Sequence, residues 1–212
     1  MEITFLGHAS FRLKGKSATA VIDPFESADV GLKFPRAVEA DVITISHDHK
    51  DHNAKDAVGG SPYVISGPGE YEVKGISVIG IGTYHDATEG KDHGKNTIYR
   101  YVIDGVHVAH LGDLGHQLSA DALDALAGTD VLMVSVSGKY LTNKETIELI
   151  AKIEPKIVIP MHYKQAGHSQ TFAGLPEVSA FLTEYGKEPQ RVAKLSVTKD
   201  KLPPDLAVVV FE

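Results

Sequence analysis

The chain has 212 residues, of which 42% are hydrophobic and 23% are charged, and its formal net charge is −7. These proportions are typical of a soluble globular protein, and we expect residues 1–212 to form a single domain. The acidic balance argues against a sequence-independent hold on DNA or RNA, which needs a basic face. The chain has no cysteine, and this excludes disulfides, thiolate zinc sites and a cysteine nucleophile.

No apolar stretch approaches the ~18 residues needed to span a bilayer, so we expect no membrane insertion. The run from Met1 to Leu6 is strand-like and lacks the basic, apolar and small-residue regions of a signal peptide. We therefore expect a cytoplasmic protein.

Short runs of β-branched residues, separated by Gly, Asp and Pro turns, dominate the first half of the chain. They predict strands at Ile3–Leu6, Ser10–Leu13, Thr19–Ile22, Val42–Ile45, Tyr63–Ile65, Ile76–Ile81, Asn96–Ile103 and Val106–Ala109. Asp104-Gly105, between the last two, is a two-residue hairpin signal. A short helix is expected from Asn53.

Helices become common in the second half. One is predicted at Ser119–Ala127, with Ser119 as the N-cap. Another is predicted at Thr142–Glu154, because Thr142 and Glu145 form a capping-box pattern. The remaining expected elements are a helix at Pro176–Tyr185, ended by Gly186, and strands at Val131–Val136, Ile157–Ile159 and Leu206–Phe211. This order of elements predicts β-sheets covered by helices.

The segment His47-Asp48-His49-Lys50-Asp51-His52 is the most informative part of the chain. It follows the strand predicted at Val42–Ile45 directly and places three imidazoles and a carboxylate within six residues. Imidazole nitrogen and carboxylate oxygen are ligands that zinc, manganese and iron accept. A solvated polar loop is the alternative interpretation. The dense pattern favours a metal site.

Three further residues of ligand type also follow predicted strands. They are His85, Asp113, which lies in a glycine-containing turn, and His162. A metal site assembled from the same end of several strands requires such placement, because rigid strands fix the residues that they release. A structural polar role is the alternative for each residue taken alone.

With these residues in this order, the chain resembles the metallo-β-lactamase superfamily over nearly its whole length. Phe5-Leu6-Gly7-His8-Ala9-Ser10, Ile22-Asp23-Pro24-Phe25, Gly112-Asp113 and Ile159-Pro160-Met161-His162-Tyr163 resemble the branch that holds ascorbate-phosphate lactonases and N-acyl phosphatidylethanolamine phospholipase D. The resemblance implies an α/β fold, a four-layer αββα sandwich with a dinuclear site along one edge of the sheets.

The resemblance also implies the ligands. One metal would be held by His47, His49 and His85 and the other by Asp51, His52 and His162, with Asp113 bridging both. His85 is preferred over His93 because it directly ends a strand. Flavodiiron relatives carry Glu at the position of His49, which disfavours redox chemistry. Zinc fits this ligand set best, and manganese or iron is possible.

Of the six histidines outside this set, four have an expected position or role. His8 and His116 occupy loop positions that could face the site, and we expect either to contact substrate or to support a ligand. His110 is expected to have a core or supporting role. His168 is expected on the surface, and the alternative is that its loop reaches the mouth of the site.

The ligand set predicts hydrolysis. Two divalent cations about 3.5–4 Å apart can share a hydroxide that attacks carbon or phosphorus. Asp51 would be both a ligand and the catalytic group that orients the nucleophile and moves its proton. We expect a small-molecule substrate, namely a phosphoester, phosphodiester, lactone or related ester. The alternatives are a metal-dependent nuclease acting on RNA and a non-catalytic metal-binding module.

Overall fold

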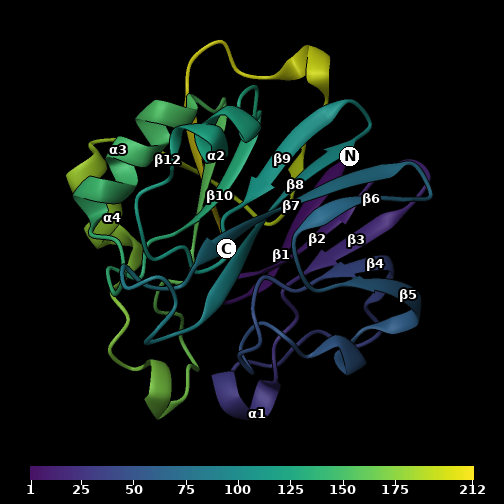
Figure 1. Ribbon diagram of the computed structural model, residues 1–212, viewed down its shortest axis with the longest axis horizontal. Helices are drawn as coiled ribbons and strands as arrows, with labels where there is room; N and C mark the ends of the chain where they lie inside the picture. The colour runs from purple at the N-terminus through teal and green to yellow at the C-terminus, as the bar shows by residue number, and fades with distance from the viewer.

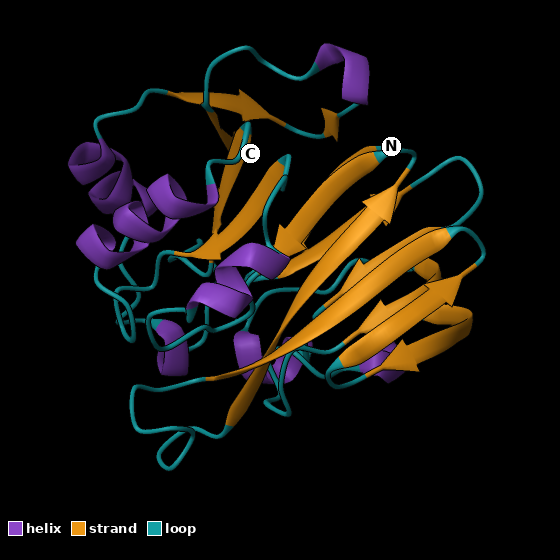
Figure 2. Ribbon diagram, turned by 45° about the horizontal axis from the view of Figure 1, so that its top comes forward, coloured by secondary structure: helices purple, strands orange, loops and turns teal.

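The computed structural model describes all 212 residues and contains two β-sheets packed face to face (Figures 1 and 2). The six-stranded sheet has the order β13 (Leu195–Ser196), β1 (Glu2–Gly7), β2 (Ser10–Lys14), β3 (Thr19–Ile22), β4 (Glu39–Thr44), β5 (Gly59–Ile65). The eight-stranded sheet has the order β12 (Pro189–Val192), β14 (Ala207–Phe211), β11 (Ile157–Met161), β10 (Val131–Ser135), β9 (Val106–His110), β8 (Lys95–Ile103), β7 (Ile76–Tyr84), β6 (Gly69–Val73).

Helices cover the two sheets unequally (Figure 2). On the outer face of the eight-stranded sheet, α2 (Ala120–Ala125), α3 (Asn143–Ile153) and α4 (Val178–Tyr185) pack over a buried apolar cluster. The six-stranded sheet is covered more thinly, by the connections that carry α1 (Ser27–Val30) and the 3-10 turn η1 (Lys55–Ala57). The expected α/β sandwich is confirmed, and its helical layer on the six-stranded sheet is reduced. No helix here has both the length and the apolarity to cross a membrane.

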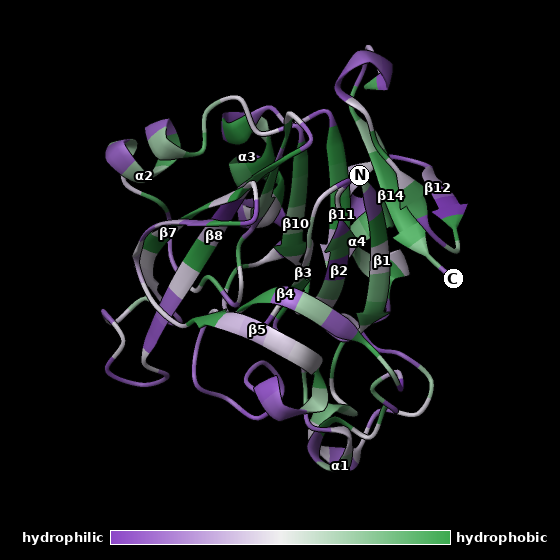
Figure 3. Ribbon diagram, turned by 90° about the vertical axis from the view of Figure 1, so that its right-hand side faces the viewer, coloured by the Kyte–Doolittle hydropathy of each residue, from purple (hydrophilic) through white to green (hydrophobic).

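The main core lies between the sheets. Alternate residues of β1, β2 and β3, such as Ile3, Phe11 and Ile22, are fully buried against strands of the other sheet. Figure 3 shows the strands of this interior in the colour of apolar residues, whereas the edge strand β5 is pale. Burial of this apolar surface is the main force that holds the sheets together.

Strand direction brings the ligand-type residues to one edge of the sandwich. β9, β10 and β11 are mutually parallel, and β7 runs in the same direction because it is antiparallel to β8, which is antiparallel to β9. By the same reasoning β1, β3 and β4 share one direction in the other sheet. The carboxyl ends of strands that share a direction lie at the same edge of a sheet, so the residues that follow them converge.

Most predicted elements are found, with boundaries shifted by a few residues. Asp104 and Gly105 both have positive φ, as a primed two-residue hairpin between β8 and β9 requires. Ser119 caps α2, and Thr142 and Glu145 form both hydrogen bonds of a capping box at α3. The helix expected from Asn53 is instead the short 3-10 turn η1. The elements that were not predicted are α1, β6, β12, β13 and the 3-10 turns η2 (Gln170–Phe172) and η3 (Lys199–Lys201).

The capping box allows a test of local stability. Thr142→Ala removes the side-chain oxygen that accepts from the Glu145 amide, at 3.2 Å. We expect the free energy of unfolding to fall by about 1 kcal/mol, measured by urea denaturation. Thr183→Ala is the matched control, because Thr183 is exposed within α4, where alanine is the better helix former. An equal loss of stability in both variants would contradict the role assigned to the cap.

Candidate metal centre

The residues that follow β1, β4, β7, β9 and β11 meet at one edge of the sandwich. Three overlapping groups offer ligand atoms that all lie within 4.8 Å of one another. The groups are His8, Asp51, His52 and His162; His47, His49 and His85; and His47, His52 and Asp113. The structure thus brings together all seven residues predicted as metal ligands, and their assignment as ligands stays a prediction.

Asp23, the residue after β3, organises the loop that carries the histidine motif. It is fully buried, with positive φ, and its carboxylate accepts hydrogen bonds from the Ser46 amide (2.8 Å), the Ser46 hydroxyl (2.6 Å) and His52 Nδ1 (2.8 Å). Asp23 lies in a segment that carries the resemblance to the family branch, but no role was predicted for it. The signal that could have found it is the one used for Asp113, an acidic residue directly after a strand.

This network fixes which nitrogen of two histidines carries the proton. The hydroxyl of Ser46 donates its one hydrogen to Asp23, so it must accept from His47 Nδ1, which lies 2.9 Å away. His52 Nδ1 donates to Asp23. In their neutral forms both rings therefore present an unprotonated Nε2 to the site, as a metal ligand requires.

Asp113 lies at the centre of the cluster. Its Oδ2 is 3.2 Å from His162 Nε2, 3.4 Å from His85 Nε2 and 3.6 Å from His52 Nε2. Asp51 reaches the same region, with its Oδ2 3.3 Å from His52 Nε2 and 3.6 Å from His162 Nε2. The two carboxylates thus face a common set of imidazoles.

The turn that presents Asp113 is built by contacts that the sequence did not reveal. Asn96 accepts from the Asp113 amide at 3.1 Å and donates to the carbonyl of Leu111 at 3.0 Å. Gly112 has a φ of +57°, and a Cβ there would clash with the Asn96 side chain and crowd Ser46. Only glycine fits this conformation and this space without strain.

The segment after β7 is held by the carboxylate of Asp86. It accepts backbone hydrogen bonds from Thr88, Gly90, Asp92 and His93. His85 is buried, in contact with Asp113, whereas His93 is exposed with its ring 5.5 Å from that of His85. This geometry agrees with the preference for His85 over His93.

Charge interactions dominate the protonation of the cluster. Burial alone would raise the pKa of Asp113, but His162 and His52 outweigh it and hold that pKa well below the usual range. The pKa of Asp51 is lowered in the same way, chiefly by His52 against the effect of burial. Burial opposes the charge on His162, yet the two carboxylates raise its pKa to about 9. Both carboxylates are therefore ionised and need positive charge beside them.

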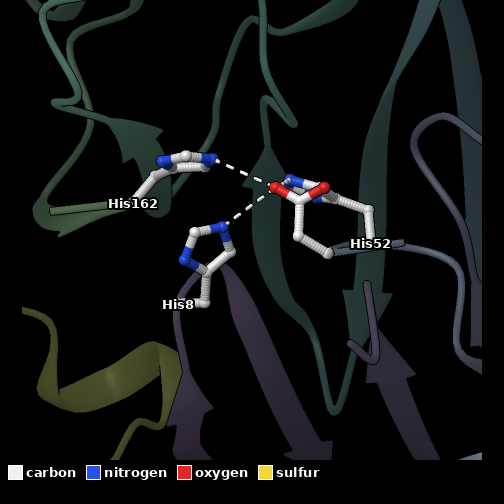
Figure 4. Close-up of side chains that lie close together, drawn as sticks. His8, His52 and His162 are labelled. Carbon is white, nitrogen blue, oxygen red and sulfur yellow. Dashed lines mark hydrogen bonds and ion pairs between the residues drawn. The ribbon is translucent and has the colours of Figure 1, made fainter. Parts of the chain in front are cut away.

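The remaining candidate histidines differ in their positions. His8 is fully buried, and its Nε2 lies 3.1 Å from Asp51 Oδ2 (Figure 4). His110 is buried and bonds to the Ala9 carbonyl and the Gly112 amide, which agrees with the supporting role expected. His116 is not brought to the cluster, because both its ring nitrogens bond to backbone groups of Tyr84 and Gln117. His168 was expected on the surface, but it is half-buried and bonds to His8.

A pocket of about 740 Å³ opens onto the cluster. Its floor includes Asp51, Asp113 and His162, and its walls include Tyr140 and Phe172. This volume is within the range of small-molecule sites.

The donor set fits a divalent cation. Six buried atoms of the cluster have no hydrogen-bond partner, and they are His47 Nε2, His52 Nε2, His85 Nδ1, both ring nitrogens of His162 and Asp113 Oδ1. Buried polar atoms without a partner are rare in folded proteins and need a specific explanation. Nitrogen and carboxylate oxygen around one point are the donors that zinc and related ions prefer.

Comparison with known proteins agrees with this architecture. The family model described as "Beta-lactamase superfamily domain" matches residues 2–162. A solved structure from Thermotoga maritima, described as that of a zinc-dependent hydrolase of the metallo-β-lactamase superfamily, is 36% identical, with a TM-score of 0.82 over 99% of this chain and 97% of that chain. The chain belongs to the metallo-β-lactamase superfamily.

Curated relatives of this superfamily member are UPF0173 proteins. A UPF0173 metal-dependent hydrolase of Thermococcus onnurineus is 28% identical over 190 residues, which cover 77% of this chain and 84% of the relative. A UPF0173 protein of Pyrococcus furiosus is 30% identical over 182 residues, with coverage of 77% and 83%. The predicted superfamily, the α/β sandwich and the assignment to a hydrolase family are confirmed.

The network around Asp23 generates a test on metal affinity. Asp23→Asn replaces one acceptor oxygen with an N–H donor, so Ser46 or His52 loses its partner and His52 is no longer held in one orientation. We expect zinc to bind about 10–100-fold more weakly, measured by competition with a chromogenic chelator. Asp41→Asn is the control, because Asp41 is a partly exposed carboxylate that pairs with Lys74 at 2.6 Å. Wild-type affinity in Asp23→Asn would contradict the assignment.

Proposed function

We propose that this superfamily member is a hydrolase that holds two divalent cations, with zinc the best fit, and cleaves a small ester. His47, His49 and His85 would hold one cation, and Asp51, His52 and His162 the other. Asp113 would lie between them. The observation that carries the proposal is the fixed, inward-facing Nε2 of His47 and His52 beside a buried ionised carboxylate.

The chemistry divides between the cations and the side chains. Divalent cations bound there would lower the pKa of coordinated water and withdraw electrons from the ester under attack. Asp51 lines the pocket, and its Oδ2 is directed toward His8, His52 and His162. Its other oxygen would accept a hydrogen bond from the attacking water and take its proton. Asp23 and Ser46 would keep the imidazoles oriented throughout.

The pocket suggests the size of the substrate more clearly than its charge. About 740 Å³ suits a small molecule. Outside the proposed ligands, the lining carries Lys50 and Lys139 but also Asp29 and Asp48, so the charges on the rim are mixed. We therefore propose an ester class that includes phosphoesters, phosphodiesters and lactones.

The finer family branch is part of the same proposal. The segments that resemble ascorbate-phosphate lactonases and N-acyl phosphatidylethanolamine phospholipase D contain His8, Asp23, Asp113 and His162, and all four lie in the cluster. This supports a shared arrangement around the reacting bond. We propose further that residues 1–212 act as one hydrolase domain, because the main core draws on both sheets.

Metal content and hydrolysis should be lost together. We expect His49→Ala and Asp113→Ala to lose at least one bound zinc per chain, by elemental analysis, and to lose hydrolysis at least 100-fold. The assay would use p-nitrophenyl phosphomonoester and phosphodiester substrates and a set of lactones, with added zinc or manganese and after chelation. The expectation follows because each residue would supply a ligand that no neighbour replaces.

His107→Ala is the matched control. His107 does not belong to the cluster, and its Nδ1 lies 2.6 Å from the Arg100 guanidinium. Full metal content in Asp113→Ala would overturn the assignment of the ligands. A metal-loaded wild type that cleaves none of these esters would contradict the proposed activity. Cleavage of RNA alone would favour the nuclease alternative.

A further inference from the structure

A series of hydrogen bonds leads from Gln165 and His168, which precede the pocket-lining residues Phe172 and Leu175, to the Asp51 carboxylate. The backbone amide of Gln165 donates to His168 Nδ1 at 3.1 Å. His168 Nε2 lies 3.2 Å from His8 Nδ1, and His8 Nε2 lies 3.1 Å from Asp51 Oδ2. The side-chain Oε1 of Gln165 also accepts from the backbone amide of His8, at 2.7 Å. Residues that are about 160 positions apart in the sequence thus form one continuous network.

The donor and the acceptor of each hydrogen bond in this series can be deduced. A backbone N–H only donates, so His168 Nδ1 must be the acceptor and carries no proton. The hydrogen of His168 then lies on Nε2 and is donated to His8 Nδ1. His8 in turn carries its hydrogen on Nε2 and donates it to Asp51.

This direction distinguishes His8 from its neighbours. By distance His8 belongs to the group of Asp51, His52 and His162, whose ligand atoms lie within 4.8 Å of one another. Its Nε2 carries a hydrogen, however, and a metal ligand needs a free lone pair at that atom. Figure 4 shows His8 and His162 directed at the same carboxylate from different sides.

His8 is also held rigidly. Its φ is +57°, a strained conformation for a residue other than glycine, and its side chain is fully buried. The ring packs on His162 at 4.1 Å and on Phe172 at 4.7 Å between centroids. Strain of this kind persists only where the surroundings impose it.

The end of the hydrogen-bond series farthest from Asp51 lies just before the residues that form part of the pocket wall. Phe172 and Leu175, which follow His168, line the pocket. Ser169 fixes this segment to the α1 region through hydrogen bonds to the carbonyls of Asp29 (2.7 Å) and Val30 (2.8 Å). Hydrogen bonds through His168 and His8 therefore join the segment that continues into the pocket wall to the Asp51 carboxylate.

We infer that His8 is a positioning residue and not a metal ligand, and that His168 and His8 together hold the Asp51 carboxylate in the orientation in which it binds its cation. The inference rests on the proposed two-cation function. It adds a connection between the segment that continues into the pocket wall and one of the two proposed cation sites.

The test compares His8→Ala, His168→Ala, the double variant and His8→Gln by zinc titration against a chelator and by the visible spectrum of the cobalt-loaded protein. We expect each single alanine variant to keep two ions per chain, with the weaker-held ion bound about 10–100-fold less tightly. The double variant should lose no more affinity than His8→Ala. His8→Gln retains an N–H donor and should recover part of the affinity and of the cobalt spectrum.

The outcomes are separable. Loss of one whole ion in His8→Ala, with wild-type binding in His168→Ala, would make His8 a ligand and overturn the inference. Unchanged affinity and spectrum in both single variants would also overturn it. A wild-type protein that binds fewer than two ions would instead refute the proposed two-cation function. His107→Ala is the control, because it removes a histidine that bonds to Arg100 and does not belong to the cluster.

Discussion

The structure is organised around two ionised carboxylates, Asp51 and Asp113, at a largely buried edge of the sandwich. Both are at most 9% exposed, and burying a charge costs several kcal/mol unless opposite charge lies beside it. Only imidazoles surround them at close range. The negative charge of the two carboxylates raises the pKa of His162 to about 9. A bound divalent cation would supply the same compensation and would leave the imidazoles free to act as ligands. The arrangement is therefore costly for folding but suited to metal binding.

The rest of the fold explains how such a site persists. Strands that run in one direction within each sheet bring the loops together, and the apolar core between the sheets holds those strands in place. Three residues at the site, His8, Asp23 and His162, have φ near +50°. Each such conformation costs about 1–3 kcal/mol, so the core stabilises a strained site. The Ser46 amide donates to the Asp23 carboxylate, and the side chains of Asn96 and Gln165 accept from the backbone amides of Asp113 and His8. These bonds hold the turns that present the side chains of the site.

The sequence was most informative where structure depends on near neighbours. The capping box at Thr142, the hairpin at Asp104-Gly105 and the placement of His85, Asp113 and His162 after strands could all be predicted from local pattern. The resemblance to a known superfamily then supplied the sandwich, which the order of elements alone would not have chosen.

The contacts that orient the site could not be predicted in this way. The bond between Asp23 and His52 joins residues 29 positions apart, and the bond between His8 and His168 joins residues 160 positions apart. Such pairs depend on how the loops pack after the sheets have formed. The short edge strands β6, β12 and β13 were missed for a similar reason, because pairing with a neighbouring strand decides them more than their own composition does.

The most direct measurement is anomalous X-ray scattering at the zinc absorption edge from crystals of the metal-loaded protein. We expect two peaks, one beside His47, His49 and His85 and one beside Asp51, His52 and His162, with Asp113 between them. Absence of both peaks, or peaks that lie away from Asp113, would contradict it.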